Sequence, residues 1–505
     1  MLTRLKVSGF KNLVDVDVQF GPFTCIAGRN GVGKSNLFDA LRFLRATASQ
    51  MTLVEAALSI RDEDKRAGNV RAIFHRVGDQ TTTNEISFEA EMILPSAGKD
   101  YLGQETKPTH TWVRYALKLR YRQPAGIGGD GGTLEVLSEE LASIPKSDWE
   151  SKIKFTHSKE WSDSVLIARS RKNPFFIATE DVQGQRAVRL YQDNRAGRAF
   201  NAPTATLPRT MLSTVQTSEY PTVVLARREI ESWGVLQLET SALRRADSFD
   251  APDHLSTNGS HLPATLQRLA KRAAERAVSS ESRETATAAI FAEVSNRLAQ
   301  LLDDVRSVSV DRDEGRQLLT LLVSGSEMTP FPANALSDGT LRFLALAVME
   351  MDRESGGLLC LEEPENGIHP QRIRPMMKLL QDFAVDTSMA CNEENPLRQV
   401  LINTHSPLVV LQAPEESLLM AELIPDVRTI PIGGDSRVVR FRKFAVSCLT
   451  GTWREQLESG QRIATKGSLL SYLNSTGPAR SPRPTTKRVM DRIDLQQLLP
   501  NLADQ

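Results

Sequence analysis

The sequence shows no bias toward either sign of charge. Its 62 Lys and Arg residues balance 62 Asp and Glu residues over 505 positions. A chain that binds nucleic acid over much of its surface carries an excess of basic residues, so the composition gives no argument for such binding and leaves only local basic patches open. Hydrophobic residues make up 40% of the chain. That share is enough for a packed core and excludes general disorder.

Cysteine is also scarce. The four cysteines, at positions 25, 360, 391 and 448, form no CxxC pair and have no histidine nearby at the spacing of a metal site. We therefore expect reduced thiols rather than disulfides or a zinc centre, as in a cytoplasmic protein.

Long hydrophobic runs are missing as well. No window approaches the roughly 18 consecutive apolar residues that a membrane-spanning helix needs. The first residues, MLTRLKVSGF, place Arg and Lys where a signal peptide would have its apolar core. We expect a cytoplasmic protein with no membrane segment.

A glycine-rich segment stands at residues 28–35. Its sequence, GRNGVGKS, fits the pattern GxxxxGK[ST], with an apolar strand expected before it and a helix after it. In that setting the loop's N–H groups bind a β-phosphate, Lys34 reaches the β- and γ-phosphates, and the Ser35 hydroxyl ligates Mg²⁺. The sequence thus predicts a site for ATP and Mg²⁺, with Gly28, Asn30, Gly31, Gly33, Lys34, Ser35 and Asn36 as its binding residues.

Two adjacent carboxylates follow an apolar run. Residues 357–361 read GLLCL, and Glu362, Glu363 and a proline come next. A phosphate-transfer site needs one acid for the metal and another to orient or deprotonate the attacking water. Glu362 fits the metal role and Glu363 the catalytic role. The alternative is an exposed acidic turn.

Two further motifs are weak alone. Ser337 and Gly339 lie in LSDGTLR at the expected start of a helix, where a hydroxyl and a bare amide can bind an anion. His405 lies in INTHSP at the expected end of a strand, where it could contact a γ-phosphate or the water. The first could be only a helix cap and the second a structural histidine. Their order after the P-loop and around the carboxylates favours the functional interpretation.

Together these motifs resemble the RecF/SMC/OLD group of ABC-class ATPases. The matching segments are SGFKNL, GRNGVGKSNLFDALRFL, NGSHLPATLQRL, LSDGTLRFLALA, LEEPENGIHP and INTHSP. The resemblance implies that Ser337 and Gly339 form a signature motif, which reaches the γ-phosphate held by a second copy. It also implies that residues 365–369 form the D-loop and that His405 is the switch histidine. The expected assembly is a homodimer, or a higher homo-oligomer, through the ATPase heads.

The chain departs from the family pattern at two points. Glu362 stands where many relatives have Asp, which should still ligate Mg²⁺. No glutamine stands out as the Q-loop residue of the family, and Gln80 is the weak candidate.

The fold expected is α/β: an ABC-type P-loop ATPase head, with a mixed sheet core and an antiparallel β lobe, and an inserted, mostly helical middle lobe. We expect an N-terminal ATPase lobe at 1–150 and a middle lobe at 151–316, irregular to about residue 255 and then containing helices near 262–278 and 285–305. A C-terminal ATPase lobe should span 317–475. A basic, proline-rich tail with a short helix should occupy 476–505.

The partner expectations also follow from the resemblance. Some OLD-type relatives carry a C-terminal nuclease, but the roughly 100 residues after INTHSP lack its acidic pattern. The chain looks more like the ATPase subunits of anti-phage systems such as Septu and PARIS, which act with a separately encoded effector, a nuclease or a toxin. The leading hypothesis is therefore an ATPase that regulates such an effector in anti-phage defence.

Other functions stay open at this stage. One is a RecF-like clamp that binds DNA in repair or recombination; a transporter subunit and a non-hydrolysing scaffold are less favoured. Contact with DNA or RNA is also open, because Arg268, Arg272 and Arg276 lie four apart on an expected helix. A solvated helix face is the commoner explanation of such a stripe.

Overall fold

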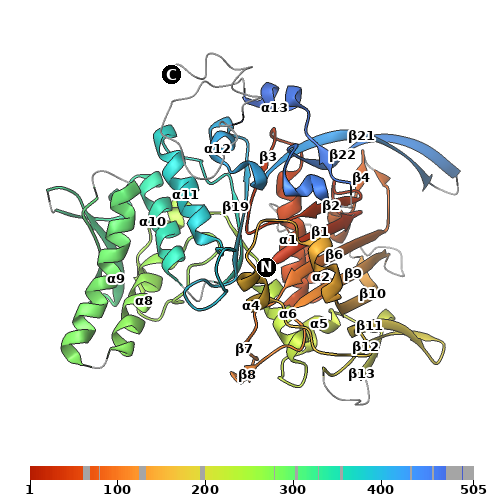
Figure 1. The fold of residues 1–505 in the computed structure, drawn as a ribbon, viewed down its shortest axis with the longest axis horizontal. Helices are drawn as coiled ribbons and strands as arrows, with labels where there is room; N and C mark the ends of the chain where they lie inside the picture. The colour runs from red at the N-terminus through yellow and green to blue at the C-terminus, as the bar shows by residue number, and fades with distance from the viewer. Residues whose placement is uncertain are drawn as a thin grey trace.

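The computed structural model describes residues 1–60, 69–78, 80–123, 132–193, 200–277, 279–301, 305–327, 329–352, 356–432, 435–457, 460–473 and 492. Over these residues the chain is a mixed α/β protein with two large sheets, and helix α1 (Lys34–Ala48) lies between them (Figure 1). The expected α/β head, with a mixed sheet and an antiparallel β lobe, is confirmed.

The first sheet is antiparallel and has eight strands, in the order β13-β12-β11-β10-β9-β6-β1-β2. The strands are β1 (Leu2–Ser8), β2 (Val16–Gln19), β6 (Glu85–Ile93), β9 (Trp112–Arg122), β10 (Thr133–Ser143), β11 (Phe175–Val182), β12 (Gln185–Leu190) and β13 (Phe200–Pro203). The last three fall in a stretch that we expected to be irregular. They continue the same sheet, because Leu141 of β10 pairs with Ile177 of β11.

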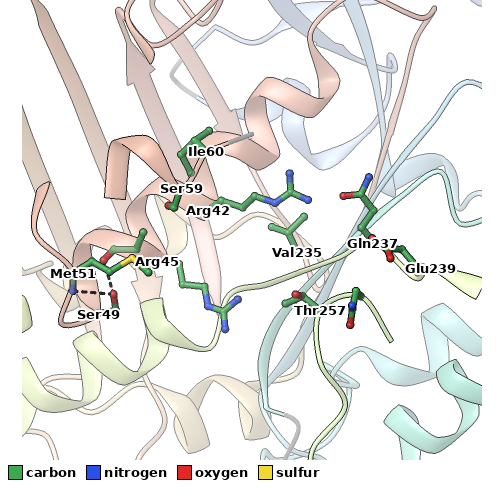
Figure 2. Close-up of a pocket in the computed structure, with 12 residues that line it drawn as sticks. Arg42, Arg45, Ser49, Met51, Ser59, Ile60, Val235, Gln237, Glu239 and Thr257 are labelled. Carbon is green, nitrogen blue, oxygen red and sulfur yellow. Dashed lines mark hydrogen bonds between the residues drawn. The ribbon is translucent and has the colours of Figure 1, made fainter. Parts of the chain in front are cut away.

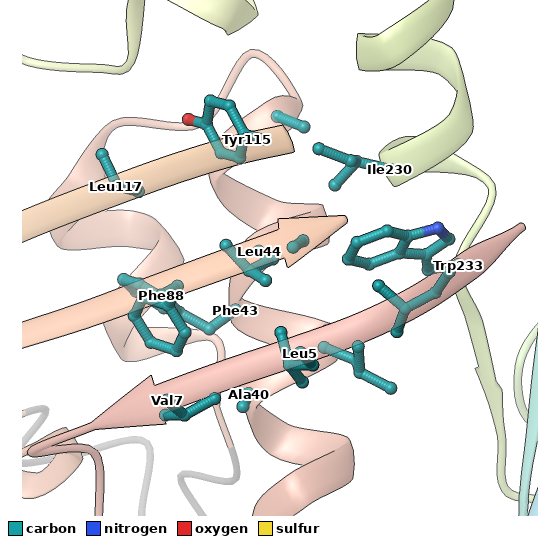
Figure 3. Packing of buried hydrophobic residues seen from close by; sticks show 14 of the residues in the cluster. Leu5, Val7, Ala40, Phe43, Leu44, Phe88, Tyr115, Leu117, Ile230 and Trp233 are labelled. Atoms are coloured by element: carbon teal, nitrogen blue, oxygen red, sulfur yellow. The ribbon is translucent and has the colours of Figure 1, made fainter. Parts of the chain in front are cut away.

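Helix α1 covers the inner face of this sheet. Its apolar residues recur at helical spacing, and the ring of Phe43 lies 5.3 Å from that of Phe88 on β6. Figure 3 shows Leu5 and Val7 of β1 turned toward the same helix. Burial of these large side chains fixes α1, and with it the glycine loop at its N-terminus, against the sheet.

The second sheet carries the parallel strands of the ATPase core. Its order is β14 (Gly234–Leu236), β19 (Gly357–Glu362), β20 (Arg398–Thr404), β3 (Phe23–Ala27), β21 (Leu418–Ile432), β22 (Asp435–Cys448) and β23 (Arg462–Ile463). Strands β14 to β21 of this order run parallel to one another. Ile26 packs on the α1 side, whereas Cys25 and Ala27 pack on the opposite side with α10 (Asp338–Met351) and α11 (Ile373–Phe383). Both faces are covered, which explains why β3, β14 and β19 are almost wholly apolar.

The parallel register brings four strand ends to one edge. Ala27 at the end of β3 pairs with Thr404, and Glu362 pairs with Asn403. Strand β14 ends beside Leu361. Loops that follow the carboxyl ends of parallel strands meet at the same edge, where α/β proteins bind ligands. The fold therefore gathers the glycine loop, the paired carboxylates and the strand-end histidine.

A helical part stands on the far side of the second sheet. It contains α8 (Leu262–Arg276) and α9 (Ser280–Leu301), which confirm the two expected helices, and a small sheet of β15 (Asp247–Ser248), β16 (Ser307–Asp313), β17 (Leu318–Ser324) and β18 (Pro330–Pro332). The expected basic stripe is not a continuous solvated face. Arg268 is buried, and one of its guanidinium nitrogens lies 2.5 Å from the buried carboxylate of Asp352.

The division into lobes stays a prediction. The expected boundary at residue 150 falls between β10 and β11, which pair in one sheet. The expected tail at 476–505 lies outside the described residues apart from Arg492.

Among the described helices, none combines the length and the apolar character needed to cross a membrane. The four cysteines are free thiols, three of them buried.

Candidate nucleotide site

The glycine loop after β3 needs glycine at several positions. Gly31 and Gly33 have φ angles of 78° and 105°, a region that side chains with a Cβ rarely adopt. A Cβ on Gly33 would lie 2.2 Å from the amide nitrogen of Asn12, and one on Gly28 would lie 2.5 Å from the carbonyl oxygen of Ala421. The loop is thus held close to its neighbours on both sides. Its tip, with Asn30 and Gly31, is exposed.

Asn12, in the SGFKNL segment, ties the N-terminal strands to this loop. Its side-chain amide donates to the carbonyl of Val32 at 3.0 Å, and the amide of Asn36 donates to the Asn12 side-chain oxygen at 2.8 Å. Asn36, predicted as a nucleotide contact, therefore also has a structural bond. The loop's shape depends on a residue that the motif pattern does not contain.

Lys34 lies folded over its own loop. Its ammonium group donates to the carbonyl oxygens of Gly28 at 2.6 Å and Arg29 at 3.0 Å. Burial lowers the pKa of Lys34 below its ordinary value. A partly desolvated ammonium held by backbone carbonyls is well placed to exchange them for phosphate oxygens, which are stronger acceptors.

The two predicted metal ligands lie side by side. The Ser35 hydroxyl donates to one carboxylate oxygen of Glu362 at 3.1 Å, and Arg42 pairs with the other at 3.3 Å. No group of three or more His, Cys, Asp or Glu side chains that could hold a metal occurs within the described ranges. Mg²⁺ needs no such group, because it is usually bound by one or two protein oxygens, water and substrate phosphates. A hydroxyl beside a carboxylate at a phosphate loop fits that donor set.

Glu363 is held in a fixed orientation just beyond β19. Its φ angle is 47°, and its N–H donates to both the backbone and the side-chain oxygen of Asn403. One carboxylate oxygen accepts from Asn366 at 2.8 Å, and the other lies 2.9 Å from Nδ1 of His405. The structure thus brings the two predicted catalytic side chains together. The φ angle of Glu363 lies in the left-handed region, which non-glycine residues adopt infrequently.

The carboxyl group of Glu363 is kept ionised. Burial alone raises its pKa, but the hydrogen bonds from Asn366 and His405 and the charge of Lys34 outweigh burial, so that the pKa lies below its ordinary value. An ionised carboxylate can accept a hydrogen bond from water and orient it.

Glu365, two residues further on, behaves differently. It is buried, accepts a hydrogen bond from the Thr404 hydroxyl, and its pKa is raised by burial. The segment between the two glutamates therefore passes from the open site into the core. This fixes the turn predicted as the D-loop to the end of β20.

The predicted signature residues, Ser337 and Gly339, stand at the start of α10. Ser337 is exposed and caps α10, where its hydroxyl accepts from the Thr340 N–H at 3.2 Å. A Cβ on Gly339 would lie 3.2 Å from the carbonyl oxygen of Gly367, so the start of α10 packs on the predicted D-loop. Arg244 holds the approach to this helix, donating to Asp338 at 2.6 Å.

Gln237 is a site residue that the sequence analysis missed. It follows β14 and lines a cavity of about 500 Å³ together with Arg342, Glu362, Glu363 and Asn366. Strand β14 has only three residues, too few to show a strand period. The signal available was its position, a glutamine directly after the apolar GVL.

Gln80, the candidate drawn from the sequence, lies elsewhere. It belongs to β5 (Gln80–Thr81), which pairs only with the short strand β4 (Arg76–Val77) among the described strands. Neither strand joins the sheet whose carboxyl ends form the site. Gln237 therefore replaces Gln80 as the candidate Q-loop residue.

Comparison with known proteins gives a family match in two blocks. Residues 23–97 and 240–411 match the family described as "AAA domain, putative AbiEii toxin, Type IV TA system". These blocks contain the glycine loop, the signature segment, the paired carboxylates and His405, whereas Gln237 falls just outside them.

Two curated relatives are DNA replication and repair proteins named RecF. The protein from Paenarthrobacter aurescens (strain TC1) is 34% identical over 90 residues, which are 18% of this chain and 22% of the relative. The protein from Parabacteroides distasonis is 34% identical over 65 residues, 13% of this chain and 18% of the relative. The chain thus matches only about a fifth of the length of these relatives.

Solved SMC head domains are similar to this chain, with low TM-scores. The SMC head bound to the C-winged helix domain of ScpA has a TM-score of 0.44 at 12% identity, covering 87% of this chain and 98% of that one. The SMC head from Thermotoga maritima has a TM-score of 0.33 at the same identity and the same coverage. The family match and the RecF relatives, with the nucleotide motifs gathered at one sheet edge, show that this chain is similar to RecF-like ATPases of the ABC class.

Proposed function

We propose that this chain binds and hydrolyses ATP. The observation that carries the proposal is the convergence of Lys34, the Ser35–Glu362 pair and the Glu363–His405 pair at the carboxyl ends of adjacent parallel strands. Backbone N–H groups of the glycine loop and the N-terminus of α1 bind the β-phosphate, and Lys34 moves from the loop carbonyls to the β- and γ-phosphates.

Ser35 and Glu362 would hold Mg²⁺, which supplies positive charge to the β- and γ-phosphates. Glu363 orients the attacking water and accepts its proton. His405, hydrogen-bonded to Glu363, lies where it can contact the same water or the γ-phosphate. Gln237, which lines the cavity beside Glu362 and Glu363, would contact the attacking water.

We further propose that two copies form the complete site. Ser337 is exposed at the start of α10, where a second copy could reach it. A serine cap and a bare glycine amide at a helix N-terminus suit the γ-phosphate held by a second copy. ATP would then join two heads, and hydrolysis would release them.

The proposed output is control of a separately encoded effector, a nuclease or a toxin, in anti-phage defence in the cytoplasm. The family description, which names a toxin and a toxin–antitoxin system, supports this proposal. The second candidate is a DNA clamp in repair or recombination. It is favoured by 34% identity to RecF over 90 residues. Proteins or DNA that co-purify from the native host separate the two: a bound nuclease or toxin favours the first, and DNA without such a protein the second.

The test of ATP binding and hydrolysis uses Lys34→Ala. Removing the ammonium should weaken ATP binding by at least about 10-fold, because a charged hydrogen-bond donor to phosphate is lost. Lys271→Ala is the matched control, since Lys271 is 75% exposed on α8. Affinity for labelled ATP and phosphate release are measured on all three proteins. Unchanged affinity in Lys34→Ala, or no turnover by the parent chain, contradicts the proposal.

A further inference from the structure

A second cavity lies behind the nucleotide site. It has a volume of about 520 Å³ and is bounded by α1, the end of α2 (Leu53–Leu58) and the segments 235–239 and 257–258. It shares Gln237 and Glu239 with the cavity beside Glu363, so this segment is the wall between them. Small-molecule sites in proteins have volumes of about 300–1,000 Å³. The cavity is therefore large enough for a ligand of nucleotide size.

Two arginines from α1 point into this cavity. Figure 2 shows Arg42 extending toward Val235 and Gln237, and Arg45 extending toward Thr257. Arg42 pairs with Asp39 at 3.0 Å and with Glu362 at 3.3 Å. Its positive charge is thus paired with the carboxylates of Asp39, on α1, and Glu362, at the end of β19.

The positive charge of Arg45 is compensated less fully than that of Arg42. Its Nε donates to the backbone carbonyl of Glu231 at 3.0 Å, and burial lowers its pKa. The carboxylate of Glu231 is bound by Arg227 at 3.1 Å and by the Tyr101 hydroxyl. A half-buried guanidinium held by a carbonyl and facing open space favours an anion as its ligand.

The rest of the lining suits an organic phosphate rather than a bare ion. Met51, Ile60 and Val235 form an apolar wall, and Gln237, Thr257 and Asn258 offer hydrogen-bonding groups opposite the arginines. Glu239 is the acidic side chain of this lining and can accept from a ligand's amino or hydroxyl group. Planar guanidinium groups bind phosphate with two parallel hydrogen bonds.

We propose that this cavity binds a small phosphorylated ligand, distinct from the ATP at the glycine loop, with its phosphate between Arg42 and Arg45 and its organic part against Met51 and Ile60. The ligand has a direct link to the proposed metal site, because Arg42 also holds Glu362. A phosphate that draws Arg42 into the cavity weakens that pair and alters the carboxylate that faces Ser35. This link rests on the proposed function, whereas binding in the cavity does not.

The test measures binding by calorimetry in the full chain carrying Lys34→Ala, which weakens phosphate binding at the glycine loop. The probes are pyrophosphate and, separately, AMP. We expect one site per chain, with a dissociation constant that rises by about 10-fold or more in Arg45→Gln. The glutamine keeps an N–H donor for the Glu231 carbonyl, so the fold should be retained. Arg316→Ala is the control and should bind as the parent does, because Arg316 is 80% exposed on the distant β16–β17 turn.

A second variant guards against a folding defect. Ser49→Glu places a carboxylate on the same wall, where it should pair with Arg45 and compete with phosphate. Melting temperatures of all variants are measured alongside. Loss of binding in Arg45→Gln and in Ser49→Glu, with unchanged melting, supports the proposal. Absence of binding by both probes, or binding that neither variant weakens, overturns it. If the parent chain fails to bind ATP while pyrophosphate or AMP still binds in the cavity, the proposed function fails and this inference stands.

Discussion

His405 Nδ1 lies 2.9 Å from a carboxylate oxygen of Glu363, although 42 residues separate them in the chain. The contact exists because β19 and β20 run parallel, with Glu362 opposite Asn403. Glu363 and His405 are each the first residue beyond their strand. Parallel pairing thus converts two separate motifs into one acid–base pair beside the glycine loop.

Glu363→Gln should abolish turnover while binding persists. The amide keeps the shape of the side chain but cannot take the proton from water, and loss of such a group typically costs roughly 10² to 10⁴-fold in rate. We expect the variant to bind ATP and to accumulate as dimers, detected by light scattering after chromatography with ATP. If Glu363→Gln turns over at the parent rate, the catalytic role belongs to another residue, and Glu362→Gln is the next variant to measure.

Gln237→Ala should slow hydrolysis with little loss of ATP affinity. Its side chain lines the cavity with both glutamates, and removal of one positioning contact of this kind costs on the order of 10-fold or more in rate. The rate is measured over a series of Mg²⁺ concentrations. Gln80→Ala is the matched control and should behave as the parent. Equal effects of the two substitutions would remove Gln237 from the site.

Ser337→Arg tests whether the site is shared. A large side chain at the exposed start of α10 should block a second copy's γ-phosphate, so the variant binds ATP but hydrolyses it poorly. Mixing it with Lys34→Ala creates heterodimers in which one composite site is intact and the other carries both defects. Activity should return to about half of the parent value per mixed dimer, as two sites become one.

A complete site within each chain would leave the mixture inactive. Strict cooperativity between the two sites could also silence the intact one. Heterodimer formation and ATP binding are therefore measured on the same samples with differently tagged chains. An inactive mixture that contains ATP-bound heterodimers counts against a single working composite site.

Arg268→Ala should destabilise the helical part. The guanidinium and the Asp352 carboxylate are both buried and lie 2.5 Å apart, and breaking a buried ion pair from one side costs about 3–5 kcal/mol in the free energy of unfolding. Arg276→Ala, at an exposed position on the same helix, should change stability by less than about 0.5 kcal/mol. Urea denaturation of the two variants measures the difference. A similar, small change in both would mean that Arg268 contributes little to the fold.

The sequence predicted the parts of the site that are local in the chain. The glycine loop and the carboxylate pair stand next to recognisable strands and helices, so their elements and spacing could be predicted. The roles of Asn12, Asn403 and Gln237 could not be predicted because they depend on tertiary structure. Asn12 contacts the glycine loop, and Asn403 lies on the strand next to Glu363. Gln237 follows a strand of only three residues. Arg268 shows a different limit of the sequence. Its spacing predicts a helix face shared with Arg272 and Arg276, but not the ion pair with Asp352 that buries it.

The packing of Gly339 against the carbonyl of Gly367 has a mechanical consequence. Asn366, one residue before Gly367, donates the hydrogen bond that orients Glu363. The start of α10 is therefore connected to the carboxylate of Glu363 through the short segment 366–367. In the proposed dimer, a second copy that docks at the exposed Ser337 would press on this connection to Glu363, so hydrolysis in each head would depend on contact with its partner.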